Sequence, residues 1–104
     1  MRLSCAGSGP LVVKLAGVAG GVGLYREEMG HAVSRGFRVA GLDTTGDRRD
    51  DPAPAPPTWE SLAGEVAEGV ERLGGRAVLW GTSFGCVLAL ATAARHPERV
   101  SGLL

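Results

Sequence analysis

The sequence predicts an α/β protein with a doubly wound parallel sheet and helices on both faces of that sheet. Short apolar runs rich in Val and Leu alternate with stretches whose apolar residues recur at helical spacing. Most connections between these segments are short, and two of them are rich in glycine. Strands that alternate with helices build parallel sheets, because each crossover helix packs on a face of the sheet.

Four strands are expected. The runs LVVKL, FRVAGLD and RAVLW are short and apolar, and VSGLL begins a fourth strand. They occupy residues 11–15, 37–43, 76–80 and 100–104. Right-handed crossovers favour the spatial order second, first, third, fourth for such strands. The strand at 37–43 would then form an edge of the sheet, without an outer neighbour.

Three helices are expected between these strands. The first covers residues 24–36, where apolar residues recur at every fourth position, at Tyr25, Met29 and Val33. The second follows Thr58, a favourable N-terminal cap, and its apolar face repeats at Leu62, Val66, Val70 and Leu73. The third, FGCVLALATAARH, is apolar on nearly all sides, so we expect it to be buried until Pro97 ends it.

The two glycine-rich loops follow the first and third strands, which the expected order makes neighbours. These loops are GVAGGVG at residues 17–23 and GTSFG at residues 81–85. In doubly wound sheets, ligands bind in the crevice where the connections from two adjacent strands diverge to opposite faces. We therefore expect the two loops to lie side by side and to form the functional site.

Composition and charge exclude several classes of function. The 104 residues carry a formal net charge of zero, which gives no reason to expect a nucleic acid or an anionic membrane as partner. Cys5 and Cys86 show neither metal-ligand spacing nor a disulfide framework. The longest apolar run, 86–94, is about half as long as a membrane span. We expect one cytoplasmic domain over residues 1–104, with no metal and no cofactor.

The loop at residues 81–85, Gly-Thr-Ser-Phe-Gly, fits the pattern G-x-S-x-G between a predicted strand and a predicted helix. Ser83 must adopt a strained conformation on this sharp turn, and side chains at 81 or 85 would collide with the neighbouring strand and helix. The Ser83 hydroxyl would lie at the positive end of the helix, where backbone amides can stabilise an oxyanion. The alternative interpretation is a small residue that caps a helix between two glycines without a function.

With this serine turn, the chain from GSGPLVVKLAG to AARHPERVSGLL resembles the α/β-hydrolases, although it is less than half as long as a usual member. The resemblance implies a partial α/β-hydrolase core with about four parallel strands. It also implies a serine hydrolase of carboxylic esters or thioesters, with Ser83 as nucleophile and Gly81 and Gly85 as the glycines of the elbow. AGGVGLY and SFG are similar to segments of the thioesterases of peptide and polyketide assembly lines.

The resemblance extends to the loop that follows the first strand. LAGVAGG matches the oxyanion loop of the family, with Ala16 in place of the usual histidine before Gly17. It implies that the backbone amides of Val18 and Phe84 form the oxyanion hole. Gly17 would then lie on the face of the site that meets the substrate.

The resemblance also covers the end of the second strand. LDTTGDRRD matches the aspartate-x-arginine-glycine turn of the family, in which Asp43 and Gly46 are kept and Thr45 replaces the arginine. Asp43 would either contact a substrate or serve as a structural turn residue. Cys86 is expected to fill core space beneath the elbow.

A base for the serine hydroxyl is the missing part of the site. A serine needs a histidine, oriented by an acid, to take its proton. His96 lies at the far end of the same helix, about 20 Å from Ser83, and is better explained as a cation at a helix C-terminus. His31 is expected on the solvent face of its helix. In this family the acid and the histidine follow the elbow. We therefore interpret the sequence as a fragment that lacks them, the first antiparallel strands, and everything beyond the start of the sixth strand.

Two other functions stay open. A non-catalytic remnant or binding module could use the same crevice, and exposed sheet edges would favour self-association. A nucleotide-binding domain would place Asp43 on a ribose, about twenty residues after the glycine-rich loop. However, G-x-G-x-x-G cannot be placed there, because Arg26 occupies the position of the third glycine, and G-K-[ST] is absent.

Overall fold

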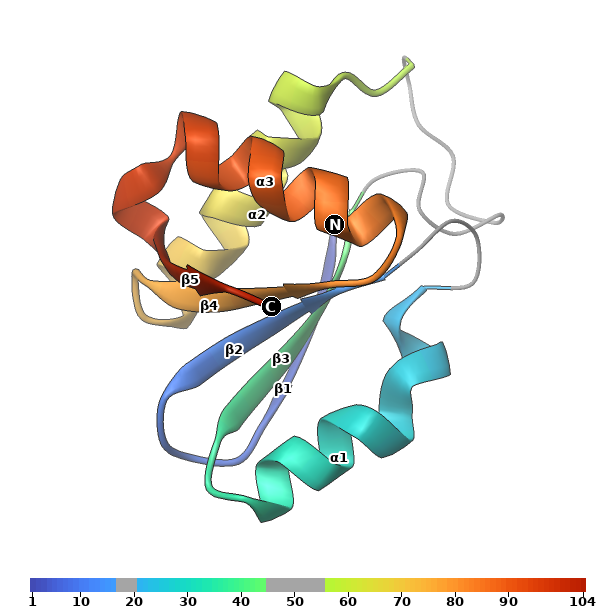
Figure 1. The fold of residues 1–104 in the computed structure, drawn as a ribbon, viewed down its shortest axis with the longest axis vertical. Helices are drawn as coiled ribbons and strands as arrows, with labels where there is room; N and C mark the ends of the chain where they lie inside the picture. The colour runs from blue at the N-terminus through green and yellow to red at the C-terminus, as the bar shows by residue number, and fades with distance from the viewer. Residues whose placement is uncertain (17–20, 45–55) are drawn as a thin grey trace.

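The sheet of this protein has five strands in the spatial order β1-β3-β2-β4-β5 (Figure 1). The structure is a computed structural model, and it describes residues 1–16, 21–44 and 56–104. The strands are β1 (Arg2–Ala6), β2 (Leu11–Leu15), β3 (Arg38–Asp43), β4 (Ala77–Gly81) and β5 (Val100–Leu103). The α-helices are α1 (Arg26–Ser34), α2 (Trp59–Leu73) and α3 (Phe84–Arg95), and the 3₁₀ turns are η1 (Val22–Tyr25) and η2 (Pro97–Arg99).

The four parallel strands confirm the expected order. β2 pairs in parallel with β3 on one side and with β4 on the other, and β5 continues the sheet beyond β4. Each strand begins and ends within one residue of its expected bounds. Because β2 and β4 are parallel neighbours, their carboxyl ends leave the sheet at the same edge.

β1 is a strand that the sequence did not predict. It pairs antiparallel with β3, from Arg2 opposite Asp43 to Ala6 opposite Val39. Two expectations are therefore wrong, because an antiparallel strand does precede β2 and β3 does have an outer neighbour. Apart from half-buried Leu3, the side chains of β1 are exposed, so RLSCA lacks the apolar pattern by which a buried strand is recognised.

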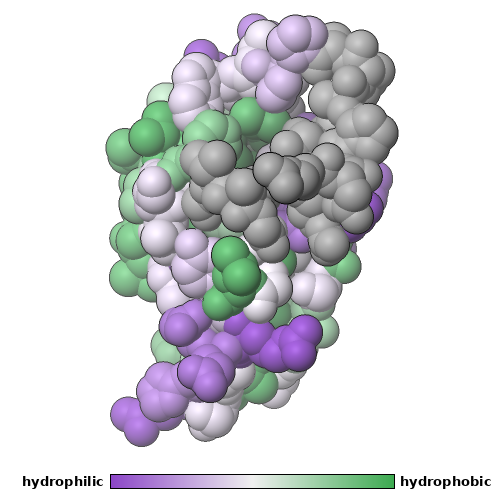
Figure 2. Space-filling view, turned by 90° about the vertical axis from the view of Figure 1, so that its right-hand side faces the viewer, coloured by the Kyte–Doolittle hydropathy of each residue, from purple (hydrophilic) through white to green (hydrophobic). Residues whose placement is uncertain are grey.

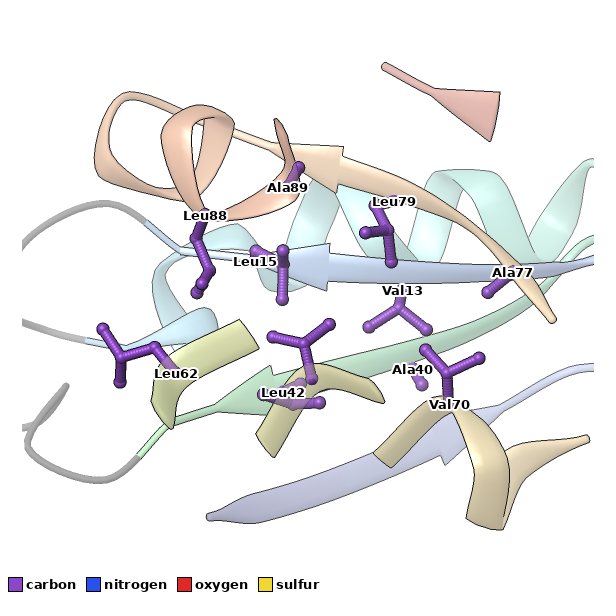
Figure 3. Packing of buried hydrophobic residues seen from close by; sticks show 11 residues of the cluster. Val13, Leu15, Ala40, Leu42, Leu62, Val70, Ala77, Leu79, Leu88 and Ala89 are labelled. Carbon is purple, nitrogen blue, oxygen red and sulfur yellow. The ribbon is translucent and has the colours of Figure 1, made fainter. Parts of the chain in front are cut away.

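Helices cover both faces of the sheet, as the sequence predicts. α1 lies on one face, whereas α2 and α3 pack against each other on the opposite face (Figure 1). The main core lies between the sheet and these two helices, and it includes Val13, Leu15, Leu42, Leu79, Leu62, Val66, Val70 and Leu88 (Figure 3). Successive side chains of a strand point to opposite faces, so Lys14, between Val13 and Leu15, faces the other way.

Local hydrogen bonding determines where the second of these helices begins. The expected first helix begins as the turn η1 and continues as α1. α2 begins directly after Thr58, as predicted. The Thr58 hydroxyl accepts a hydrogen bond from the Ser61 N–H at 3.0 Å, and the Ser61 hydroxyl accepts one from the Thr58 N–H at 2.9 Å. This reciprocal capping box satisfies donors that a helix start otherwise leaves unpaired.

α3 is buried on one side only, which corrects the expectation that it is buried nearly all round. Leu88, Ala89 and Thr92 are buried, whereas Val87 and Leu90 are 48% and 60% exposed. The apolar character of the helix therefore exceeds what the described residues cover. Within the described ranges, none of the helices is both long and apolar enough to span a membrane.

Candidate active site

The chain turns from β4 into α3 within two residues, and Ser83 lies at this turn. Ser83 has φ 56° and ψ −116°, and among the described residues it is the only one other than glycine with a positive φ. Such a conformation costs an L-residue about 1–3 kcal/mol. The Thr82 carbonyl accepts a hydrogen bond from the Gly85 N–H, and the Ser83 carbonyl accepts one from the Cys86 N–H, both at 2.9 Å. These bonds begin α3 and fix the turn.

Gly81 and Gly85 leave no room for a side chain. A Cβ atom at position 81 would lie 2.4 Å from the Gly85 carbonyl oxygen. A Cβ atom at position 85 would lie 2.3 Å from the Leu15 carbonyl oxygen and 2.8 Å from that of Ala16. The first glycine therefore lets the strand meet the helix, and the second lets the helix meet the end of β2.

The side chain of Ser83 is exposed, and a backbone donor follows it directly. Phe84 is the first residue of α3, so the helix itself offers no carbonyl partner for the Phe84 N–H. The positive end of the helix macrodipole lies at this point. A negative charge that develops on a group bonded to Ser83 would meet a favourable electrostatic environment. Gly17 and Val18, which the resemblance places in the oxyanion loop, lie outside the described residues.

Asp43, at the end of β3, supports the start of η1. Its Oδ1 accepts a hydrogen bond from the Val22 N–H at 2.8 Å, and the residue is buried. Gly21 precedes this contact with φ 73°, and a Cβ atom there would lie 2.9 Å from the same Oδ1. Asp43 therefore ties the start of η1 to β3, which is a structural role. A contact between Asp43 and a substrate stays a prediction.

Lys14 is the residue beside the elbow that the sequence analysis did not single out. It is 1% exposed, and its Nζ donates a hydrogen bond to Thr82 Oγ1 at 2.5 Å. The Nζ atom also lies 4.1 Å from the ring centre of Tyr25 and 4.5 Å from that of Trp80. The available signal was a lysine at an inner position of the apolar run LVVKL, where a cation requires buried partners.

Within the described part of the chain, no hydrogen bond joins either histidine to Ser83. His96 follows the last residue of α3, and its Nδ1 is 3.9 Å from Glu98 Oε1. His31 is exposed on α1, where it lines a depression of about 590 Å³ with Glu27, Glu28, Ala32 and Trp80 of β4. Across residues 1–16, 21–44 and 56–104, no three His, Cys, Asp or Glu side chains gather as metal ligands would.

Cys86 does not fill the core beneath the elbow, contrary to expectation. It is exposed, and its Sγ donates a hydrogen bond to the Gly81 carbonyl at 3.1 Å. Residues four apart share a helix face, so Cys86 lies on the exposed side of α3 with Leu90. With Ala89, Leu90, Leu103 and Leu104 it lines a shallow depression of about 220 Å³.

A depression whose described lining residues are all uncharged lies next to the elbow, between α2 and α3. The rings of Trp59 and Phe84 stack with a centroid distance of 5.1 Å and an interplanar angle of 28°. Together with Pro57, Thr58 and Leu62 they line a depression of about 460 Å³. Figure 2 views the molecule from the side of the carboxyl ends of the strands, and hydrophilic residues gather over its lower part, where α1 lies in Figure 1.

Comparison with known proteins identifies the family. The α/β hydrolase fold family matches residues 10–104. A Mycobacterium phage D29 protein described as a non-heme haloperoxidase is 31% identical over 100 residues, which cover 95% of this chain and 36% of that protein. A proline iminopeptidase of Neisseria gonorrhoeae is 39% identical over 72 residues, 65% of this chain and 23% of that one. A thermophilic esterase from Thermogutta terrifontis superposes with a TM-score of 0.82 at 27% identity, over 98% of this chain and 38% of that one.

The chain spans well under half the length of each of these proteins. The family match nevertheless begins just before β2 and includes the elbow, α3 and β5. The parallel order of the strands, the positive φ of Ser83 and the two crowded glycines agree with that match. The chain belongs to the α/β-hydrolase fold family.

Proposed function

We propose that the chain is the nucleophile-bearing part of a serine hydrolase that acts on carboxylic esters or thioesters. One observation carries this proposal: Ser83 is exposed, with a positive φ, at the N-terminal end of α3. A strained serine has no evident structural benefit at a position where glycine would relieve the strain. The presence of serine at this position is accounted for if the hydroxyl itself reacts.

In this reaction Ser83 Oγ attacks the carbonyl carbon of the substrate, and a base takes the hydroxyl proton. The carbonyl oxygen becomes an oxyanion, which accepts hydrogen bonds from the Phe84 and Val18 amides. The alcohol or thiol then leaves, and water hydrolyses the acyl-enzyme. His31 and His96 are poorly placed to act as the base, so we propose that the base and its acid come from polypeptide outside these 104 residues.

The depression beside the elbow indicates which kind of substrate group could bind there. Within the described part of the chain, the depression beside Phe84 is lined by Pro57, Thr58, Trp59 and Leu62, none of which carries a charge. An apolar group of the substrate would fit such a surface better than a charged one, because burial of an unpaired charge is costly. This supports an uncharged ester or thioester with an apolar group next to the scissile carbonyl.

The test uses the complete hydrolase that contains these residues. We expect a fluorophosphonate probe to label the wild-type protein at Ser83. Ser83→Ala should abolish labelling and lower ester or thioester turnover by a factor of about 10⁴ or more, because it removes the nucleophile. Ser101→Ala, which removes an exposed serine from β5, is the matched control and should leave both readouts unchanged.

Two outcomes would contradict the proposal. Labelling that persists in Ser83→Ala would move the nucleophile elsewhere. A folded wild-type protein that neither labels nor hydrolyses any ester or thioester tested would favour the non-catalytic alternative, a binding module that uses the same crevice.

A further inference from the structure

Lys14 is a buried cation whose contacts lead directly to the elbow. It lies on β2, where it is opposite Trp80 of β4 in the parallel register. The residue is 1% exposed, and in the described part of the chain no carboxylate forms an ion pair with it. Removal of an ammonium group from water is expensive, so the groups around Nζ must compensate for the loss of hydration.

Among the described residues, three groups are in direct contact with the Lys14 ammonium. The Tyr25 ring of η1 and the Trp80 ring of β4 lie 4.1 Å and 4.5 Å from Nζ, within the range of cation–π attraction. The hydroxyl of Thr82 accepts a hydrogen bond from Nζ at 2.5 Å. The two rings fix the position of the ammonium, and the hydrogen bond transmits that position to the turn.

Thr82 immediately precedes Ser83 and is part of the elbow. Its carbonyl accepts the hydrogen bond from the Gly85 N–H that begins the turn into α3. The side chain of Thr82 is therefore held by β2, while its backbone holds the helix start. A shift of Thr82 would change the backbone angles available to Ser83, whose positive φ requires support from its surroundings.

We propose that Lys14 is a positioning residue of the nucleophile: its hydrogen bond to Thr82 holds the elbow in the geometry in which Ser83 reacts. This inference rests on the proposed serine hydrolase function. Lys14 does not touch the substrate, and its effect passes through Thr82. Its loss should slow the reaction of Ser83 while the fold is maintained.

The ionisation of Lys14 provides a readout that does not depend on activity. Burial lowers the pKa of the amine below its usual 10.5, and the nearby Cys86 and Glu28 oppose this shift more weakly. At pH values between the lowered pKa and 10.5, the unfolded chain binds more protons at this site than the folded one. The free energy of unfolding should therefore rise with pH over this interval, and Lys14→Met should remove that rise.

The experiment measures fluorophosphonate labelling of Ser83 in the complete hydrolase. Lys14→Met removes the donor and the charge, and Thr82→Val removes the acceptor with little change of shape. We expect each variant to label at least tenfold more slowly. We also expect the double variant to be no slower than the slower single variant, because both changes delete one contact. Thr82→Ser keeps the hydroxyl and should restore most of the rate.

A control separates positioning from general stability. Val39→Ala trims a buried side chain of β3, and it should lower the melting temperature without slowing labelling of the folded protein. Labelling of Lys14→Met at the wild-type rate, or effects of Lys14→Met and Thr82→Val that multiply, would overturn the inference alone. A wild-type protein that shows the pH-dependent stability but does not label would instead overturn the proposed function, and the positioning role with it.

Discussion

Residues 81–85 show how closely a backbone can determine which side chains are tolerated. Ser83 adopts a positive φ at the turn from β4 into α3, and the flanking glycines are confined by nearby backbone atoms. The Gly85 Cα lies against the carbonyl groups that end β2. Two segments that are far apart in the sequence are therefore in contact at the site.

This packing predicts opposite effects for two glycine-to-alanine changes. Gly85→Ala places a Cβ atom 2.3 Å from a backbone oxygen, so we expect a loss of about 3 kcal/mol or more in the free energy of unfolding. Gly30, on α1, has no atom within 4 Å of the corresponding position. Gly30→Ala should therefore stabilise the protein by about 0.5–1 kcal/mol, through helix propensity alone. Urea denaturation of both variants measures the difference, and a Gly85→Ala protein as stable as wild type would contradict the packing.

At the residue scale, the sequence predicted some positions well and missed others. The G-x-S-x-G spacing indicated where a side chain could not fit, because that constraint is local and steric. Lys14 was missed because its partners are far along the chain: Tyr25 belongs to η1, and Thr82 follows β4. The apolar run LVVKL predicts a strand that contains a lysine, but it does not show which residues surround the lysine amine.

Among the elements, α2 positions an aromatic wall of the depression beside the elbow. Trp59 is the first residue of α2, and its ring stacks on Phe84. The capping box of Thr58 and Ser61 fixes where this helix begins. The N-terminal cap therefore influences both the stability of the helix and the position of Trp59.

Loss of this cap is expected to have a measurable cost. Thr58→Ala leaves the Ser61 N–H without its side-chain acceptor, so the free energy of unfolding should fall by about 0.5–2 kcal/mol. Ser34→Ala is a matched control, because its hydroxyl only donates to the His31 carbonyl at an exposed helix end. That change should stay within about 0.5 kcal/mol of wild type. Equal losses in the two variants would show that the capping box adds nothing to stability.

At the element scale, buried segments were predicted more reliably than exposed ones. β2, β3 and β4 are largely apolar because the sheet buries most of their side chains, and this pattern is visible in the sequence. β5 was also predicted, although its residues are only half-buried or exposed. The strand β1 is mostly exposed and is held by backbone pairing with β3, which leaves no such pattern. Cys86 was misplaced for a related reason, since an apolar helix does not reveal which of its sides meets the sheet.

At the scale of the whole molecule, the 104-residue chain has a buried apolar core, but it also exposes several large apolar side chains. Large apolar side chains remain exposed on α3 and at the end of β5, namely Val87, Leu90, Leu103 and Leu104. β5 is also the last strand in the order of the sheet. Apolar surface beside a strand edge favours association with another chain.

We therefore expect the isolated chain to be inactive toward p-nitrophenyl esters and to associate in solution. His96 follows the far end of α3, and in the described part of the chain no hydrogen bond joins His31 to Ser83. A double variant lacking both histidines should therefore give the same result in the assay. Turnover measured together with light scattering tests both expectations, with the complete hydrolase as the active reference. A soluble monomer with turnover that depends on Ser83 would contradict them and would require a base within these residues.

The crowding around Gly81 and Gly85 also has an evolutionary consequence. Every other amino acid carries a Cβ atom, so there is no conservative replacement at either position and no gradual series of intermediates through which the turn could change. Ser83 is different, because its side chain points away from the packed backbone and is exposed. A lineage can therefore exchange the reacting group at position 83 while the frame that presents it is inherited unchanged. A single substitution at position 83 can therefore change the reacting group, whereas a change in the conformation of the turn would require several substitutions at once.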